Sequence, residues 1–325
     1  MPCFHPIKGY RQLYSGAVTK NYKNSNGIPA TVPCRQCSGC RQEYSRQWAM
    51  RNMHEASLWL NNIFITLTYN DNHIPNITNA EGEIISNTLV KKDFQDFMKR
   101  LRKHKKATTK NPVRFFHCGE YGENFGRPHY HAILFNTNFR DRETLHAKGC
   151  KGLTDSETLN KLWGKGHTSI GDVTFQSASY VSGYVQKKIN GQQKDSHYRV
   201  IDKSTGEEVG DRQQEYSTMS RRPGIAGLWF AKHKNDVYPS DNVHINGKEM
   251  RPPTYYDRLY EIDHRSELEI IKQNRKEKAK QFAHLRTPEA LAYLEKTHKA
   301  RMSIFKRGKL PVSYTHLTLP TNREV

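Results

Sequence analysis

The sequence predicts an α+β fold built on a central antiparallel sheet. Three segments have the β-branched and aromatic character of strands, at residues 63–69, 113–121 and 129–135. Two segments show helical apolar spacing, at residues 89–104 and 177–189. A short turn containing Gly and Pro separates the last two strands and predicts a hairpin. We expect the strand 129–135 in the middle of the sheet and the helix 177–189 across one of its faces.

The elements follow from local patterns in chain order. A helix is expected at 41–60, where aromatic and apolar side chains recur at helical spacing. The strand at 63–69 ends in Asn and Asp turn residues. The helix at 89–104 has an apolar stripe and a basic outer face. The other expected elements are a polar loop or hairpin at 76–88, a basic loop at 103–110, a short helix at 155–163, a short strand at 168–173, and a polar hairpin or mobile loop at 190–218.

Composition divides the chain into four parts. We expect a Cys-containing segment and helix at 1–60, a main domain at 61–260, and a charged helical arm at 261–311. Residues 312–325 break the character of the chain abruptly and resemble a translated sequencing adapter, so we expect a non-native tail that is not part of the fold.

The chain is strongly basic, with 52 Lys and Arg against 32 Asp and Glu and a formal charge of +20. Such an excess predicts a polyanionic partner, nucleic acid before anionic membrane. The sequence contains no apolar run that would predict a membrane span or a signal peptide, so we expect a cytosolic protein. In a cytosol, its cysteines are expected to be thiols or metal ligands. A charge run is often only a solvated face, but here the basic side chains predict a DNA track. Its members are Lys103, Lys105, Lys106, Lys188, Arg221 and Arg222.

A pair of histidines predicts a metal site. His129 and His131 lie two residues apart on a strand, so both side chains leave the same face. Glu120 lies on the expected partner strand, where a hairpin can place its carboxylate beside them, and Glu123 in the turn is the alternative. This donor set suits Mg²⁺ or Mn²⁺, with Zn²⁺ as a competitor. The alternative is two histidines that only pack or face solvent.

Two tyrosines predict nucleophiles. Tyr180 and Tyr184 lie four residues apart on one face of the expected helix, followed by Lys187 and Lys188. A phenol has a pKa of about 10 and needs help to attack, which a nearby lysine can give. Two phenols have a mechanistic use, since one can hold a covalent 5′-phosphate while the other attacks the next junction. The alternative is aromatic packing of an amphipathic helix.

A third cluster contains cysteines. Cys34, Cys37 and Cys40 stand at two-residue gaps with Cys3 nearby, which predicts a structural Zn²⁺ site. An iron–sulfur site and a set of reduced structural thiols are the alternatives. Cys118 is assigned to packing, as is Cys150.

Three motifs in this order carry a resemblance to a known family. They are residues 64–69, the Gly-Arg-Pro-His-Tyr-His run at 126–131, and the Tyr-x3-Tyr-x2-Lys run at 180–187. The chain resembles rolling-circle replication initiators of the HUH superfamily, and most of all those of microviruses of the gokushovirus branch. The likeness extends to residues 33–41, 46–49 and 220–225, and covers most of residues 1–260.

The resemblance implies an HUH-type domain at 61–260 and a DNA-nicking, strand-transferring enzyme. In such proteins a nick in the viral-strand origin leaves a 5′-phosphotyrosine and a free 3′-OH, and a second transfer rejoins the unit-length circular genome. Carried over by motif, His129 and His131 are metal ligands, with Glu120 as the third, Tyr180 and Tyr184 are nucleophiles, and Lys187 is the motif lysine.

The resemblance also implies partners and a location. The partners are single-stranded origin DNA and the host polymerase and helicase, because the sequence has no Gly-Lys-Ser/Thr phosphate loop for a helicase of its own. The location is the host bacterial cytoplasm, with no membrane partner. Two rivals remain: a related HUH transposase or relaxase, which the segments at 33–41 and 220–225 disfavour, and a non-catalytic, zinc-bearing nucleic-acid-binding protein.

Overall fold

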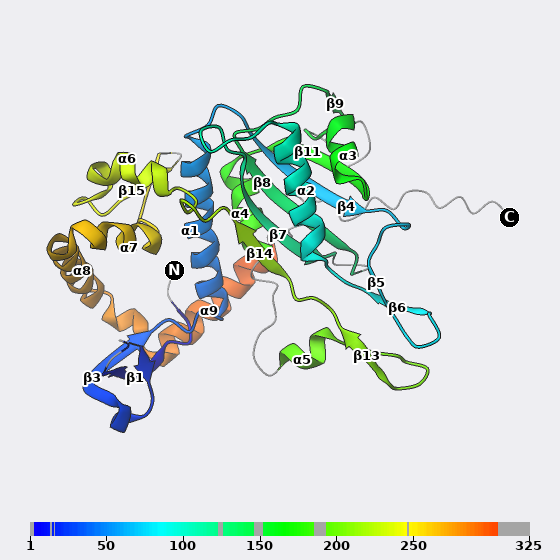
Figure 1. Ribbon diagram of the computed structural model, residues 1–325. Helices are drawn as coiled ribbons and strands as arrows, with labels where there is room; N and C mark the ends of the chain where they lie inside the picture. Colours follow the sequence, from blue (N-terminus) through cyan, green and yellow to red (C-terminus); the bar gives the residue numbers. More distant parts are fainter. Residues whose placement is uncertain are drawn as a thin grey trace. The chain divides into compact units, whose positions relative to one another are not determined.

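The computed structural model describes residues 3–13, 15, 17–122, 126–145, 152–184, 193–245 and 247–304 (Figure 1). Among these residues, contacts gather into two compact units. One contains the residues up to Gln47 and those from Asn235 onward, and the other contains Trp48–Lys234. The boundary falls inside helix α1 (Ser38–Ala56). The domain limits expected at residues 60, 260 and 311 remain a prediction, because compactness does not tell which segments fold independently.

The second unit is built on a seven-stranded sheet in which all neighbouring strands are antiparallel, which confirms the predicted α+β class. The histidine strand is third in the order and is hydrogen-bonded on both sides, so it is interior as expected. In spatial order the strands are β14 (Tyr216–Met219), β7 (Arg114–Tyr121), β8 (Pro128–Phe135), β4 (Asn62–Tyr69), β11 (Gly166–Asp172), β10 (Thr154–Ser156) and β9 (Arg142–Thr144).

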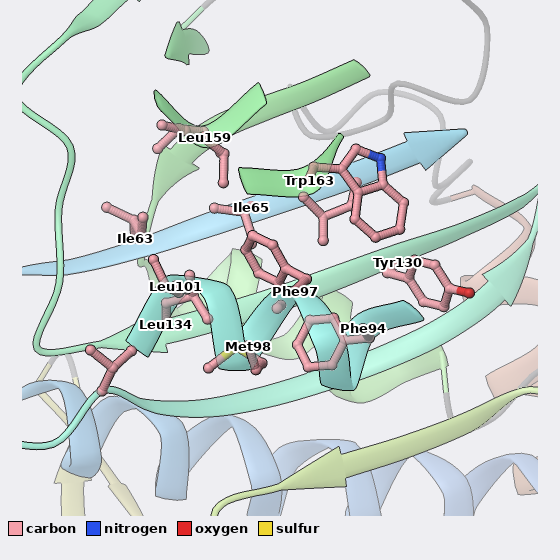
Figure 2. Close-up of a cluster of buried hydrophobic side chains, with 14 of the residues drawn as sticks. Ile63, Ile65, Phe94, Phe97, Met98, Leu101, Tyr130, Leu134, Leu159 and Trp163 are labelled. Atoms are coloured by element: carbon pink, nitrogen blue, oxygen red, sulfur yellow. The ribbon is translucent and has the colours of Figure 1, made fainter. Parts of the chain in front are cut away.

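One face of this sheet is covered by helices α2 (Lys91–His104) and α3 (Glu157–Trp163). Side chains alternate between the two faces of a strand, so every second residue of β4 enters this core. Figure 2 shows the cluster, in which the apolar stripe of α2 meets the sheet. Its labelled members are Ile63, Ile65, Phe94, Phe97, Met98, Leu101, Tyr130, Leu134, Leu159 and Trp163.

The opposite face of the sheet packs against helix α4 (Phe175–Tyr184) and the second half of α1. Ala178 and Val181 of α4 are fully buried among Phe64, Phe116 and Ile133 of the sheet. The tyrosine helix therefore crosses one face of the sheet, as the sequence predicts. Its expected continuation to residue 189 lies outside the described residues.

The region expected as a polar hairpin or loop at 190–218 contains more structure than its composition suggests. Its end forms β14, whose four residues pair with Phe116–Gly119 at the edge of the sheet. Residues this polar become a strand because β7 offers them a free edge, which is a tertiary effect that local pattern does not reveal. The smaller elements around it are β5 (Asn76–Thr78), β6 (Ile84–Asn87), α5 (Gln193–Tyr198), β12 (Arg199–Ile201) and β13 (Glu208–Asp211).

The first unit contains a small N-terminal sheet, which the sequence did not predict, and C-terminal helices, which it did. The sheet has the order β2 (Val18–Thr19), β1 (Ile7–Gln12) and β3 (Ser25–Val32), with a 3₁₀ turn at Tyr22–Asn24. Within the described residues, no helix is both long and apolar enough to cross a membrane. The remaining elements are α6 (Gly227–Val237), which crosses the unit boundary, β15 (Val243–Ile245), β16 (Lys248–Met250), α7 (Thr254–Asp263), α8 (Arg265–Lys280), a 3₁₀ turn (Ala283–Arg286) and α9 (Pro288–Ile304).

A buried ion pair fixes the start of β7 against α1. Glu55 Oε1 lies 2.6 Å from Nε of Arg114, and the two side chains are 0% and 6% exposed. The other carboxylate oxygen accepts a hydrogen bond from the backbone N–H of Ala226 (2.7 Å), and Arg114 also donates to the carbonyl oxygen of Pro223 (2.9 Å). These bonds compensate both buried charges, so the pair depends on both partners.

The substitution Glu55→Gln should leave the buried Arg114 guanidinium without a counter-charge. It should therefore lower the free energy of unfolding, measured by urea denaturation, by about 3–5 kcal/mol. The matched control is Glu157→Gln, which breaks an exposed pair with Lys161 on α3 and should cost less than about 1 kcal/mol. Equal losses in the two variants would contradict the role assigned to the buried pair.

Candidate metal and tyrosine site

Strand register brings the two histidines and Glu120 together. In the β7–β8 hairpin Glu120 is directly opposite His129, and Cys118 is opposite His131. Because side chains two apart share a face, Glu120, His129 and His131 all project to the α4 side of the sheet. One oxygen, Oε1 of Glu120, lies 2.7 Å from Nε2 of His129 and 3.0 Å from Nε2 of His131. The expected grouping is thus present in the structure.

Each histidine is oriented by its other ring nitrogen. Nδ1 of His129 lies 3.0 Å from the carbonyl oxygen of Arg127, and Nδ1 of His131 lies 2.9 Å from the hydroxyl of Thr66 on β4. The Arg127 carbonyl can only accept, so Nδ1 of His129 donates to it, and Nε2 is the ring nitrogen that faces Glu120. A hydrogen bond at the far ring nitrogen is the usual support of a metal-binding histidine.

The site is deeply buried and charged. Glu120, His129 and His131 are 0%, 5% and 1% exposed. Burial raises the pKa of Glu120, but the charge and hydrogen bonds of His129, followed by those of His131, outweigh it and lower that pKa to about 2. The carboxylate is therefore ionised near neutral pH. The three donor atoms lie within 4.8 Å of one another, so two imidazole nitrogens and one carboxylate oxygen fit a single divalent cation.

Tyr180 projects from α4 toward these ligands. Its ring centroid lies 5.4 Å from that of His131, edge to face, and 6.4 Å from that of Phe64. The side chain is half-buried, so it packs and also reaches the surface. Tyr184 ends the described part of α4, and its side chain lies outside the description. Lys187, Lys188 and Glu123 lie outside the described residues altogether.

The four N-terminal cysteines also gather, in the first unit. The Sγ atoms of Cys3, Cys34, Cys37 and Cys40 all lie within 4.8 Å of one another. Burial raises the pKa of Cys37, but the backbone N–H groups of Cys40 and Phe4 and two neighbouring thiols lower it to about 6. Cys118 is buried in the sheet core, in line with its assignment to packing, and Cys150 lies outside the described residues.

The expected DNA-contacting side chains have different surroundings. Lys103 and Lys106 are exposed at the end of α2, whereas Lys105 donates a hydrogen bond to the carbonyl oxygen of Asn138 and lies over the Phe139 ring. Burial lowers the pKa of Lys105. Arg221 and Arg222 are exposed in the turn after β14, and Lys188 is outside the described residues.

Sequence reasoning missed the residues that orient the ligands. Thr66 belongs to a motif that had been singled out, but a threonine in a strand is ordinary and only its pairing opposite His131 shows its role. The contribution of Arg127 comes from its backbone carbonyl, which no side-chain pattern can indicate.

Comparisons with known proteins find a family model and related sequences. Residues 62–189 match the family model described as replication-associated protein ORF2/G2P. The chain is 31% identical over 300 residues to replication-associated protein ORF2 of Spiroplasma virus 4, covering 86% of this chain and 87% of that protein. It is 30% identical over 272 residues to replication-associated protein VP4 of Bdellovibrio phage phiMH2K, covering 81% and 78%. No solved structure is similar to the chain at a significant level.

The orientation of His131 is testable. Thr66→Val removes the hydroxyl beside Nδ1 and should weaken Mn²⁺ binding about 10–100-fold, measured by isothermal titration calorimetry. Thr218→Val is the matched control, because it removes the same 2.9 Å contact from His117 on the other face of β7. That variant should bind Mn²⁺ as the wild type does. Unchanged affinity in Thr66→Val would show that His131 is not held as a ligand by this bond.

Proposed function

The chain belongs to the family of phage replication-associated proteins, and on that premise we propose that it initiates rolling-circle replication by nicking single-stranded origin DNA and rejoining the product. The enzyme is then a metal-dependent endonuclease and strand transferase that works through a 5′-phosphotyrosine. The observation that carries the proposal is the convergence of Glu120, His129 and His131 beside the ring of Tyr180. Burying three titratable side chains next to one another is costly, and side-chain packing alone does not explain it.

The donor set supports Mg²⁺ or Mn²⁺ as the cofactor, held by Nε2 of His129 and His131 and by Glu120, with Zn²⁺ as a competitor. When bound, such a cation polarises a phosphate oxygen and offsets the charge that develops in the transition state. Thr66 and Arg127 keep the two imidazoles turned toward that position. The β7–β8 hairpin keeps the carboxylate opposite them.

The nucleophile in this proposal is a tyrosine of α4. The hydroxyl of Tyr180 loses its proton, and its oxygen forms a bond to phosphorus in line with the departing group. The bond from phosphorus to the 3′-oxygen breaks, and that oxygen takes up a proton to leave a free 3′-OH. Tyr184, one helical turn later, would attack the next junction, so one phenol holds a strand while the other transfers it. Lys187 is proposed to stabilise the phenolate or the phosphate oxygens.

The proposed partners follow from this reaction. The free 3′-OH is the primer that a host polymerase would extend, and a host helicase would open the duplex. The work would take place in the host bacterial cytoplasm. One rival is a zinc-bearing nucleic-acid-binding protein without catalysis, which the covalent-capture experiment below distinguishes. The other is a related HUH transposase or relaxase.

A rigid loop supports a DNA path at Arg221 and Arg222. Both side chains are exposed, whereas the backbone that follows them is fixed. Arg51 donates a 3.0 Å hydrogen bond to the carbonyl oxygen of Ile225, in addition to the bonds that Glu55 and Arg114 make to this loop. A backbone that is already held lowers the entropy that this loop loses when its two cations meet phosphates, which favours binding.

The nucleophiles are tested by covalent capture. We expect wild-type protein with Mn²⁺ to form an SDS-resistant adduct on single-stranded DNA tiled across the genome that carries this gene. Tyr180→Phe/Tyr184→Phe should form none, because neither phenol can attack. The readout is the shift of labelled DNA on a denaturing gel.

Two controls accompany this assay. Tyr293→Phe changes an exposed tyrosine of α9 and should leave the adduct intact. Glu120→Gln should lower the adduct yield by about 10²-fold or more, since a ligand charge is lost. An adduct that still forms in the double tyrosine variant would refute the proposal. An adduct that wild-type protein forms without any divalent cation would refute the metal dependence of the reaction.

The DNA path is tested by salt dependence. Arg221→Ala/Arg222→Ala should weaken binding to a labelled single-stranded oligonucleotide and reduce the slope of log K against log salt by about 1.4, if each arginine meets one phosphate. Fluorescence anisotropy measures both quantities. Lys280→Ala/Lys299→Ala removes the same charge from lysines paired with Glu277 and Glu295, and should leave the slope unchanged. Equal effects of the two double variants would point to net charge alone.

A further inference from the structure

The four N-terminal thiols have the spacing of ligands around one metal ion. Their sulfurs lie within 4.8 Å of one another, and Sγ of Cys3 is 3.9 Å from Sγ of Cys37. Four thiolates about 2.3 Å from a tetrahedral Zn²⁺ are separated by about 3.8 Å along each edge. A multi-iron cluster interposes iron and sulfide atoms and spreads its cysteines further apart. The distances therefore favour a single ion over an iron–sulfur cluster.

Backbone amides point at these sulfurs. The N–H of Cys34 donates to Sγ of Cys3 (3.2 Å), and that of Cys37 donates to Sγ of Cys34 (3.3 Å). The N–H of Phe4 donates to Sγ of Cys37 (3.4 Å). Such donors stabilise the thiolate over the thiol. A packed group of neutral thiols would gain little from this arrangement, whereas a tetrathiolate site with excess negative charge gains from every bond.

The cysteines close a sheet that lacks a core of its own. Cys3 precedes β1 and Cys34 follows β3, and these strands pair from Ile7 opposite Val32. Within the described residues of β1, β2 and β3, no side chain is buried. Three short strands without a fully buried apolar side chain are at most marginally stable in water alone. Cys40 lies in the first turn of α1, so the cluster also joins the sheet to that helix.

We infer that Cys3, Cys34, Cys37 and Cys40 bind one structural Zn²⁺ that holds the N-terminal sheet folded against the start of α1. This site differs from the Glu120–His129–His131 site in ligand chemistry, since thiolates select Zn²⁺ and oxygen-containing sites select Mg²⁺ or Mn²⁺. It is independent of the proposed nicking reaction, because neither its metal nor its residues take part in that step.

The test measures metal in the full-length chain. Protein purified without chelator and dialysed against EDTA should retain one zinc per chain by inductively coupled plasma mass spectrometry, with no bound iron. Cys34→Ser/Cys37→Ser should lose it, and Cys118→Ala, which removes a buried thiol elsewhere, should keep it. Zinc absent from the wild type, zinc retained in the double serine variant, or iron in place of zinc would each overturn the inference.

A second measurement needs no variant. Titration of wild-type protein with p-hydroxymercuribenzoate should release the zinc, detected with a metallochromic dye, and expose the N-terminal sheet. Trypsin should then cut at Lys8, Arg11 and Lys20 roughly tenfold or more faster, while sites in α2 keep their rate. Zinc release without faster cleavage would overturn the structural role. If the protein did not nick DNA, the zinc content and the trypsin cleavage rates would be unchanged. The zinc inference and the proposed nicking reaction can therefore fail independently.

Discussion

The register of the β7–β8 hairpin is the constraint on which the site depends. Side chains on a strand alternate, so a slip of one residue would turn Glu120 away from both histidines and into the core formed with α2. The pairing is held on both sides, by β14 at the edge and by β4 next to β8. The buried pair of Glu55 and Arg114 fixes the beginning of β7 to α1. The sheet thus positions Glu120, His129 and His131 together on the face that packs against α4.

That polar group is costly to bury, and its surroundings show how the cost is met. Every ring nitrogen of His129 and His131 has a polar atom within 3.0 Å, and the carboxylate lies between them. These contacts hold the three side chains in place. Tyr180 lies beside it on a helix packed by Ala178 and Val181, so the phenol belongs to a rigid element and not to a loop. A separate cysteine cluster serves the N-terminal sheet, where apolar burial is lacking.

The sequence predicted the main sheet strands, α2 and the Glu120–His129–His131 grouping because their patterns are local. The two-residue spacing of the histidines and the short hairpin determine which side chains share a face. It did not predict β14, whose polar residues become a strand by pairing with β7. It also missed the N-terminal sheet, where Gly9 and Pro29 weaken the strand pattern and pairing supplies the structure. Nor did it predict Thr66 or the Arg127 carbonyl as supports. The roles of Tyr184 and Lys187 remain predictions from their motif.

Mapping the covalent link would identify the nucleophile that attacks the DNA. After reaction with single-stranded DNA and Mn²⁺, the adduct is digested with nuclease and trypsin and sequenced by mass spectrometry. We expect a residual nucleotide on the peptide Gly166–Lys187, attached through phosphate to Tyr180 or Tyr184. A nucleotide attached to any other residue would contradict the proposed reaction, as would an adduct formed by the variant that lacks both tyrosines.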